Sequence, residues 1–383
     1  MTQLFTPLRL RGIDLPNRIV ISPMCQYSAK DGFAEAWHTV QYGRFAVGGA
    51  GTVMIEASAV TPEGRITHGD VGIWSDEHAA KLAPIAAFLR SQGAVPAIQL
   101  GHAGRKASMQ RPWHGNGALN QADFDRGDEP WDIVAPSAVP QGEGHLMPAA
   151  LDDAGLAGVR MAFVQAAKRA DAAGFDIVEV HNAHGYLLHS FLSPLSNRRN
   201  DAYGGDAEGR MQFPLEVARA VRDAFPAHKP VFVRLSVVDG AEGGRPEEES
   251  IAFAAALKAA GIDVLDCSSG GIAGPSTAAR VRRSYGFQVP FADRIRRETG
   301  IATMAVGLLV DPHQAEAVIA EGKADLVAIG REALEDPNWP LHALAALSGE
   351  AHHADRWPEQ HGWWLDVRHS ALAHIGPYTK AAE

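Results

Sequence analysis

Cysteine is scarce in this chain, and long apolar runs are missing. The 383 residues include only two cysteines, Cys25 and Cys267, which are too few for a disulfide framework or a four-cysteine iron–sulfur cluster. No window approaches the ~18 consecutive apolar residues of a membrane span, and no basic and apolar secretory signal begins the chain. We therefore expect no membrane partner and a reducing, cytoplasmic location.

Dense runs of basic residues are also missing. Lys and Arg total 35 against 45 for Asp and Glu, a net charge of −10, so we expect no nucleic-acid partner. The chain is 46% hydrophobic and 21% charged, which is typical of a globular protein with a large core. At 383 residues it is too long for a small zinc or disulfide module, and one α/β barrel fits its length.

Eight apolar runs of strand length alternate with segments of helical periodicity. Most of the runs are apolar on both faces, as in a parallel sheet buried under helices. The predicted strands are 18–23, 52–57, 95–100, 177–181, 231–235, 264–268, 303–306 and 326–329. Predicted helices between them include 76–92, 156–173, 210–224, 247–260 and 312–321.

The joints that lead from helix to strand repeat one pattern. Gly174, Gly261 and Gly322 each stand where a helix can end in left-handed geometry, and an apolar strand follows directly. The repeat predicts the α/β class with a single (β/α)8 TIM barrel. A doubly wound sheet is the competing fold, but no G-x-G-x-x-G fingerprint follows any strand.

Three segments lie outside the repeat. Residues 6–17 have the pattern of a hairpin that plugs the bottom of the barrel. Residues 108–147 are rich in Gly, Pro, Asn and Asp, and their tryptophans, Trp113 and Trp131, favour an ordered cap. We expect residues 1–349 to form the barrel domain and 350–383 to form an aromatic tail that packs on another surface.

Candidate functional residues follow the predicted strands, because barrel enzymes build their sites from the loops at the strands' carboxyl ends. Gly307-Leu308 and Gly330-Arg331 follow the last two strands, where glycine frees backbone N–H groups and Arg331 begins a helix. This pattern indicates a phosphate site. In the alternative interpretation, Gly330 forms a tight turn and Arg331 a surface ion pair.

His181 and His184 follow the fourth strand, three residues apart, so both imidazoles can face one way. The pair could recognise a substrate oxygen, form a satisfied structural pair or ligate zinc, although no H-E-x-x-H motif or nearby acid supplies a third ligand. Tyr186 could supply a proton or only bury its ring. Arg234 ends a buried strand and needs an anion, either a ligand or a structural carboxylate.

Together these segments resemble the old yellow enzyme family of FMN-dependent ene-reductases, and more closely its short bacterial branch of xenobiotic reductases and thermophilic-like members. The resemblance extends to about residue 340. It rests on Ser22-Pro23-Met24-Cys25-Gln26-Tyr27, on residues 98–106 and on residues 181–205.

The resemblance implies FMN as cofactor, NADPH as electron donor and no metal. The residues that would hold FMN lie at the ends of several strands: Ser22, Pro23, Met24, Cys25, Ala57, Gln99, Arg234, Gly307, Leu308, Gly330 and Arg331. Arg234 would stabilise the negative charge of the reduced flavin. Cys25 would tune the flavin's potential and substrate affinity without acting as a covalent nucleophile.

The resemblance also implies a substrate site. His181 and His184 would donate hydrogen bonds to the carbonyl or nitro oxygen of an activated alkene, and Tyr186 would protonate the α-carbon. The other expected substrate-binding residues are Tyr27, Asn182, Ala183 and Trp364. The implied activity is ping-pong reduction of enones, maleimides, nitroalkenes or related xenobiotics.

The tail departs from the family pattern. The short branch carries a Pro-x-x-Tyr element whose following residues enter a neighbouring subunit's site, and here His361 stands where tyrosine is expected. We hypothesise that Trp363 or Trp364 forms an aromatic wall of an adjacent pocket in a homodimer or homotetramer, because the tail would otherwise expose a large apolar patch.

Two other functions stay open at this stage. A metal-dependent barrel hydrolase would use His181 and His184 as ligands. A non-catalytic barrel would bind a ligand through the 108–147 cap.

Overall fold

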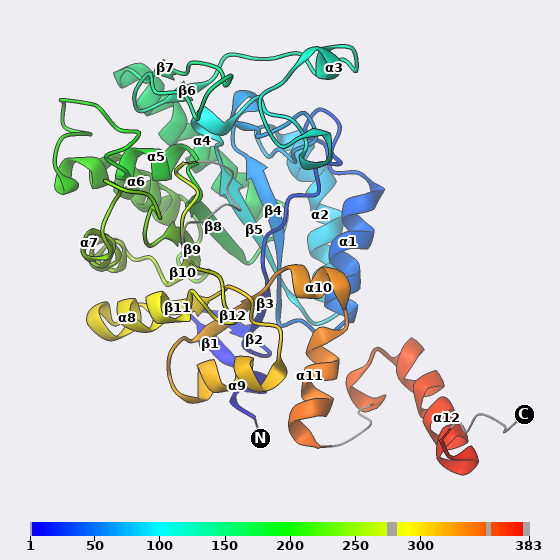
Figure 1. Cartoon of the computed structure of the whole chain (residues 1–383). Coiled ribbons are helices and arrows are strands. Elements are labelled where there is room, and N and C mark those ends of the chain that lie inside the picture. Colours follow the sequence, from blue (N-terminus) through cyan, green and yellow to red (C-terminus); the bar gives the residue numbers. More distant parts are fainter. Residues whose placement is uncertain (1, 274–281, 350–353, 378–383) are drawn as a thin grey trace, which may run out of the picture.

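A closed barrel of eight parallel strands forms the centre of the computed structural model, which describes residues 2–273, 282–349 and 354–377 (Figure 1). Its strands are β3 (Ile19–Ile21), β4 (Thr52–Ala59), β5 (Val95–Gly101), β8 (Ile177–Asn182), β9 (Val231–Ser236), β10 (Val264–Ser268), β11 (Ala302–Ala305) and β12 (Leu326–Ile329). The barrel closes where β12 pairs with β3, with Val327 opposite Ile19. The predicted fold and all eight predicted strands are confirmed.

Helices surround the barrel, and each of the five predicted ones is present. The larger helices between strands are α1 (Ala36–Val47), α2 (Asp76–Ser91), α4 (Asp153–Ala172), α6 (Ala207–Ala224), α7 (Glu247–Ala259), α8 (Val289–Thr299) and α9 (Pro312–Ala320). Side chains of Asp152, Asp206 and Asp311 cap the amino ends of α4, α6 and α9. The three joint glycines have φ of 91°, 85° and 68°, as the left-handed helix ends require.

The predicted hairpin is also confirmed. Strand β1 (Leu8–Leu10) pairs antiparallel with β2 (Ile13–Leu15), and the turn between them includes Arg11 at a φ of 52°. Leu15 is fully buried in a cluster with Met54 and Phe232, which lie inside the barrel. The hairpin therefore closes the amino end of the barrel and leaves the opposite end for the site.

The cap covers the carboxyl end of the barrel. Its regular elements are η4 (Pro112–His114), α3 (Gln121–Phe124) and β6 (Val134–Ala135), which pairs with β7 (Ala149–Ala150). Figure 1 shows this segment above the ends of β4 and β5. Trp131 of the cap packs in an apolar cluster with Tyr27 and Tyr186, whereas Trp113 is 61% exposed.

The chain continues through α10 (Arg331–Glu335) and α11 (Trp339–Ser348) to the tail helix α12 (Glu359–Ile375). In Figure 1, α12 lies at the side of the molecule, away from the mouth of the barrel. Trp363 and Trp364 are 61% and 66% exposed, so the expected packing of the tail is not met within the described part of one chain. Residues 350–353 and 378–383 of the predicted tail lie outside the described residues. None of the described helices combines the length and apolar character needed to cross a membrane.

Candidate active site

A cavity of about 640 Å³ lies at the carboxyl ends of the barrel strands. This volume is in the range of pockets that hold a small molecule or cofactor. Eight of the predicted cofactor residues line it, together with His184: Ser22, Pro23, Met24, Arg234, Gly307, Leu308, Gly330 and Arg331. The fold thus brings together residues that are more than 300 positions apart in the sequence.

Arg234 holds a buried positive charge at this cavity. The residue is 8% exposed, and its Nε lies 3.1 Å from Oδ2 of Asp266, a fully buried neighbour on β10. On its other side, Nη1 donates to Oγ of Ser22 at 3.4 Å. Both interpretations of Arg234 therefore hold in part, because a structural carboxylate pairs with the guanidinium while the side chain still lines the cavity.

A second buried acid, Glu179, lies in the same layer of the barrel. Its Oε1 accepts a hydrogen bond from Nε2 of Gln99 at 2.7 Å. Burial, with the negative charge of Asp266, raises the pKa of Glu179 to about 8. Burial raises the pKa of Asp266 as well, and the nearby charge of Arg234 opposes that rise. Burial therefore favours the protonated form of Glu179, and the ion pair at this point of the barrel is that of Arg234 with Asp266.

The predicted phosphate residues, Gly307, Leu308, Gly330 and Arg331, line the same cavity. Gly307 has a φ of 117°, and a Cβ there would lie 2.9 Å from Nε2 of Gln288, so only glycine fits without displacement. Leu308 also has a positive φ of 52°. Arg331 is exposed at the cavity, and no ion pair of Arg331 occurs among the described residues, which gives the surface ion-pair alternative no support.

His181 is a buried, neutral hydrogen-bond donor. Its Nδ1 accepts from the backbone N–H of Ala183 at 3.3 Å, so the proton lies on Nε2. The ring stands nearly perpendicular to that of His184, with centroids 5.2 Å apart. Burial, and then the charge of Arg234, lower the pKa of both imidazoles well below the ordinary value.

His184 lies beside His181, and one of its ring nitrogens already makes a hydrogen bond within the protein. Its Nε2 is 2.7 Å from Oγ of Ser268. If the Ser268 hydroxyl donates to Nε2, the proton is on Nδ1 and that nitrogen can donate to a ligand. The orientation of one hydroxyl thus decides whether His184 can act as the second predicted donor.

Tyr186, Tyr27 and Cys25 form the apolar side of the site. They pack with Ile66, Met109 and Trp131. The ring of Tyr186 is edge-on to His181, at 4.9 Å between centroids. Burial raises the pKa of the Tyr186 phenol and of the Cys25 thiol well above their ordinary values, so both stay protonated at neutral pH. A protonated thiol is a poor nucleophile.

Nine predicted residues do not line the main cavity: Cys25, Tyr27, Ala57, Gln99, His181, Asn182, Ala183, Tyr186 and Trp364. Ala57 lines a small adjoining space of about 10 Å³ with His181 and Tyr186. Gln99 is 2% exposed and turned toward Glu179, and Asn182 is 1% exposed with no hydrogen-bond partner for Oδ1 among the described residues. Trp364, on α12, lines neither space.

Sequence reasoning missed several residues that shape the site. Lys106 is 3% exposed and donates from Nζ to the backbone oxygens of His184, at 2.7 Å, and Gly271. Lys106 follows the glycine-rich end of a predicted strand, and this position could have marked it as a candidate site residue. The buried pair of His189 and Asp239 had no local signal, because the two residues are 50 positions apart.

No group of three or more His, Cys, Asp or Glu side chains suited to a metal occurs within residues 2–273, 282–349 and 354–377. The arrangement instead combines a closed barrel, a cavity lined by a buried guanidinium, glycine-rich turns and His184, and further neutral donors in the neighbouring space. It is typical of barrel enzymes that hold a phosphorylated organic cofactor.

The comparisons define the family. A sequence model of the NADH:flavin oxidoreductase / NADH oxidase family matches residues 3–349, and the chain belongs to this family. It is 43% identical over 348 residues to an NADPH dehydrogenase of Geobacillus thermodenitrificans, covering 90% of this chain and 95% of the relative. It is 41% identical over 350 residues to an NADPH dehydrogenase of Bacillus subtilis, covering 91% and 96%.

The structure is similar to that of morphinone reductase in complex with tetrahydroNAD, with a TM-score of 0.73, 28% identity and coverage of 90% of each chain. The predicted family, oxidoreductase class and cofactors are confirmed. The hydrolase and non-catalytic alternatives find no support in these relatives.

The residues of the cavity fit FMN. The flavin ring carries negative charge when reduced, and Arg234 offers a guanidinium held in place by Asp266. The phosphate needs N–H groups and positive charge, and Gly307, Gly330 and Arg331 offer both within the same cavity. The two carboxylates that line the cavity, Glu332 and Glu335, are half-buried and exposed, and the fully buried Asp266 is offset by Arg234.

Proposed function

We propose that the protein is an NADPH-dependent ene-reductase that reduces the activated C=C bonds of enones, maleimides, nitroalkenes or related xenobiotics. The observation that carries this proposal is a contiguous set of two neutral imidazoles and one protonated phenol: His184 lines the cavity with Arg234, and His181 and Tyr186, which line the small neighbouring space, are in ring contact in the order His184, His181, Tyr186. The NADPH dehydrogenases at 41–43% identity support the electron donor. We further propose a ping-pong cycle in which donor and substrate use this one cavity in turn, and a cytoplasmic location.

In this proposal, residues at one end of the cavity hold the flavin ring and residues at the other end hold its phosphate. The proposed ring residues that line the cavity are Ser22, Pro23, Met24 and Arg234, and the proposed phosphate residues are Gly307, Leu308, Gly330 and Arg331. Cys25, Ala57 and Gln99 do not line it and complete the proposed ring site from neighbouring strand ends. FMN, when bound, would carry a hydride from NADPH to the β-carbon of the substrate. Arg234 stabilises the negative charge that accompanies reduction.

The proposal also assigns substrate roles to the residues beside the cavity. Nε2 of His181, and Nδ1 of His184 when Ser268 donates to Nε2, hydrogen-bond to the carbonyl or nitro oxygen and draw electron density from the double bond. Their low pKa values keep them neutral, so they polarise the substrate without protonating it. The Tyr186 phenol delivers the proton to the α-carbon and regains one from solvent. Tyr27 orients the substrate, and Asn182 and Ala183 shape the backbone between the histidines.

A visible spectrum under anaerobic conditions tests the proposal. The purified protein should be yellow, NADPH should bleach it, and cyclohexenone should restore the colour with formation of the saturated ketone. Cyclohexanone, which has no C=C bond, is the matched control and should leave the bleached enzyme unchanged. A protein that is bleached by NADPH but not recoloured by an enone, a maleimide or a nitroalkene would contradict the proposed activity.

Replacement of Tyr186 by Phe separates the acid from the rest of the site. The change removes the hydroxyl and keeps the ring that packs on His181, so we expect the rate of cyclohexenone reduction to fall about 10²-fold or more, as for loss of a general acid. Reduction of the flavin by NADPH needs no such proton and should change less than about threefold. Stopped-flow absorbance measures both steps. Equal slowing of the two steps would show that Tyr186 is not the acid.

We propose that residues 350–383 form a tail that reaches a neighbouring subunit of a homodimer or homotetramer, with Trp363 or Trp364 in the adjacent pocket. The two indoles are in contact, with ring centroids 4.5 Å apart, and Val367 and Ile375 of α12 are 47% and 77% exposed. Such a cluster of exposed apolar side chains is typical of an interaction surface.

Deletion of residues 350–383 should therefore lower the sedimentation coefficient toward that of the monomer and raise KM for cyclohexenone. The double variant Trp363→Ser/Trp364→Ser should also lower the sedimentation coefficient and raise KM, while FMN stays bound. An unchanged oligomer with unchanged KM would refute the role of the tail.

A further inference from the structure

The turn that carries His184 and Tyr186 has an unusual backbone. His184 and Gly185 follow one another at φ values of 60° and 78°, so a residue with a large side chain occupies the left-handed region directly before a glycine. A Cβ on Gly185 would lie 2.3 Å from the backbone oxygen of Gly271. The turn therefore needs fixed partners to keep the imidazole and the phenol in place.

Three hydrogen bonds hold the turn. Nζ of Lys106 donates to the backbone oxygen of His184 at 2.7 Å, and the backbone N–H of His184 donates to Oγ of Ser236 at 2.9 Å. The backbone N–H of Gly185 donates to Nδ1 of His189 at 2.8 Å. His189 lies on α5 (Leu187–Leu192) and is fully buried.

The bond from Gly185 requires one particular tautomer of His189. Nδ1 accepts, so it carries no proton, and Nε2 must be the N–H donor. Nε2 lies 2.9 Å from Oδ1 of Asp239, a residue that is 2% exposed. The carboxylate thus selects the tautomer that can accept from Gly185.

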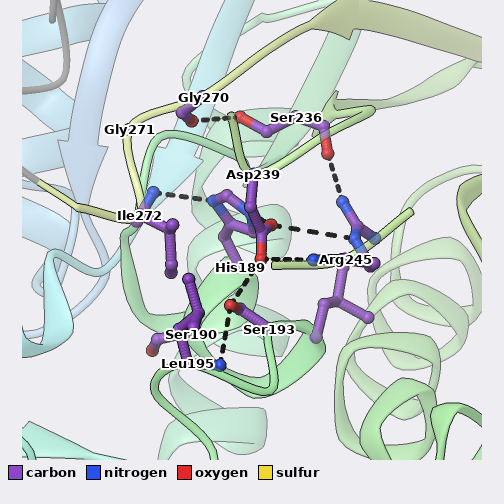
Figure 2. A network of polar contacts seen from close by, with 12 residues as sticks. His189, Ser190, Ser193, Leu195, Ser236, Asp239, Arg245, Gly270, Gly271 and Ile272 are labelled. Atoms are coloured by element: carbon purple, nitrogen blue, oxygen red, sulfur yellow. Dashed lines mark hydrogen bonds and ion pairs between the residues drawn. The ribbon is translucent and has the colours of Figure 1, made fainter. Parts of the chain in front are cut away.

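Asp239 is itself held rigidly. Its Oδ2 accepts from Oγ of Ser193 at 2.6 Å and from the backbone N–H of Arg245 at 2.8 Å. The Arg245 side chain donates to the backbone oxygen of Ser236, whose Oγ donates to Gly270 at 2.8 Å (Figure 2). These contacts connect the loops that follow β8, β9 and β10.

We propose that His189 and Asp239 are positioning residues for substrate binding, which act through the Gly185 backbone to hold His184 and Tyr186 above the cavity. Neither side chain lines the cavity, so neither touches substrate or cofactor. Without the acceptor at Nδ1, the Gly185 N–H loses its partner in the buried turn, and the two ligand-facing side chains lose their fixed spacing. The inference rests on the proposed function, because it assigns His184 and Tyr186 to the substrate.

Two substitutions at His189 differ in whether they keep a hydrogen-bond acceptor for the Gly185 N–H. His189→Leu removes the acceptor, and His189→Asn places a carbonyl oxygen near the position of Nδ1. In Asp239→Asn the amide oxygen is needed at the position of Oδ2, which accepts from Ser193 and from the backbone N–H of Arg245. The NH2 group then faces Nε2 of His189, which favours the other tautomer and removes the acceptor for Gly185 without changing the imidazole. His78→Leu is the matched control: His78 is 4% exposed and makes two hydrogen bonds, to Ser75 at 2.7 Å and to the backbone of Asp31 at 2.9 Å, but lines neither cavity.

The readout is the dissociation constant of cyclohexanone, measured by the change in flavin absorbance of the oxidised holoenzyme. We expect about tenfold or more weakening for His189→Leu and Asp239→Asn, as for loss of a supporting hydrogen bond, and less than about threefold for His189→Asn and His78→Leu. FMN should stay bound, and dithionite should still bleach it, in all four variants.

Three results would overturn the inference: Asp239→Asn binding as tightly as the wild type, His189→Asn as weak as His189→Leu, or His78→Leu equally weakened. If instead the wild type fails to reduce cyclohexenone, the proposed function fails, and the two failures are thereby distinguished.

Discussion

The site depends on one buried guanidinium. Arg234 lies in the carboxyl half of β9, where a charge is costly to bury without a counterion, and Asp266 on the next strand supplies that counterion 3.1 Å away. Burial and the negative charge of Asp266 favour the protonated form of Glu179, which carries no second negative charge. The pair leaves the outer face of Arg234 directed at a cavity that can hold an anionic ring.

The same charge determines the chemistry of its neighbours. After burial, Arg234 is the largest cause of the lowered pKa of His181 and His184, which therefore act as neutral donors. Tyr186 keeps its proton because it is buried on the apolar side. A cationic group for the cofactor and neutral hydrogen-bond donors beside it suit a reaction in which the substrate is polarised through an oxygen. A hydrolase would instead need a metal ion or a charged base.

Much of the fold was predictable from the sequence because the barrel repeats. Apolar runs gave strand positions to within two residues, and the joint glycines marked where helices end. Helix α1 was not predicted, because Glu35 and His38 cap it instead of the usual Ser, Thr, Asp or Asn. The tail was expected to pack, yet Trp363 and Trp364 are exposed in the single chain, since nothing in a sequence shows which subunit a helix contacts.

The site was predictable only where a residue follows a strand directly. That rule found Arg234 and His181, but it could not show that Gln99 turns toward Glu179 or that Nε2 of His184 meets Ser268. Those contacts depend on pairings between distant strands, which local patterns do not encode. For the same reason, the partner of Arg234 could be anticipated as a carboxylate but not named.

The most direct test of the account is the affinity of the apoprotein for FMN, measured by flavin fluorescence quenching. Arg234→Ala removes charge-assisted donors to the ring, so the dissociation constant should rise about 10- to 100-fold. Arg169→Ala, which breaks an ion pair with Asp76 on the outside of the barrel, should leave it unchanged. An unchanged FMN affinity in the Arg234 variant would contradict the central claim that this guanidinium builds the cofactor site.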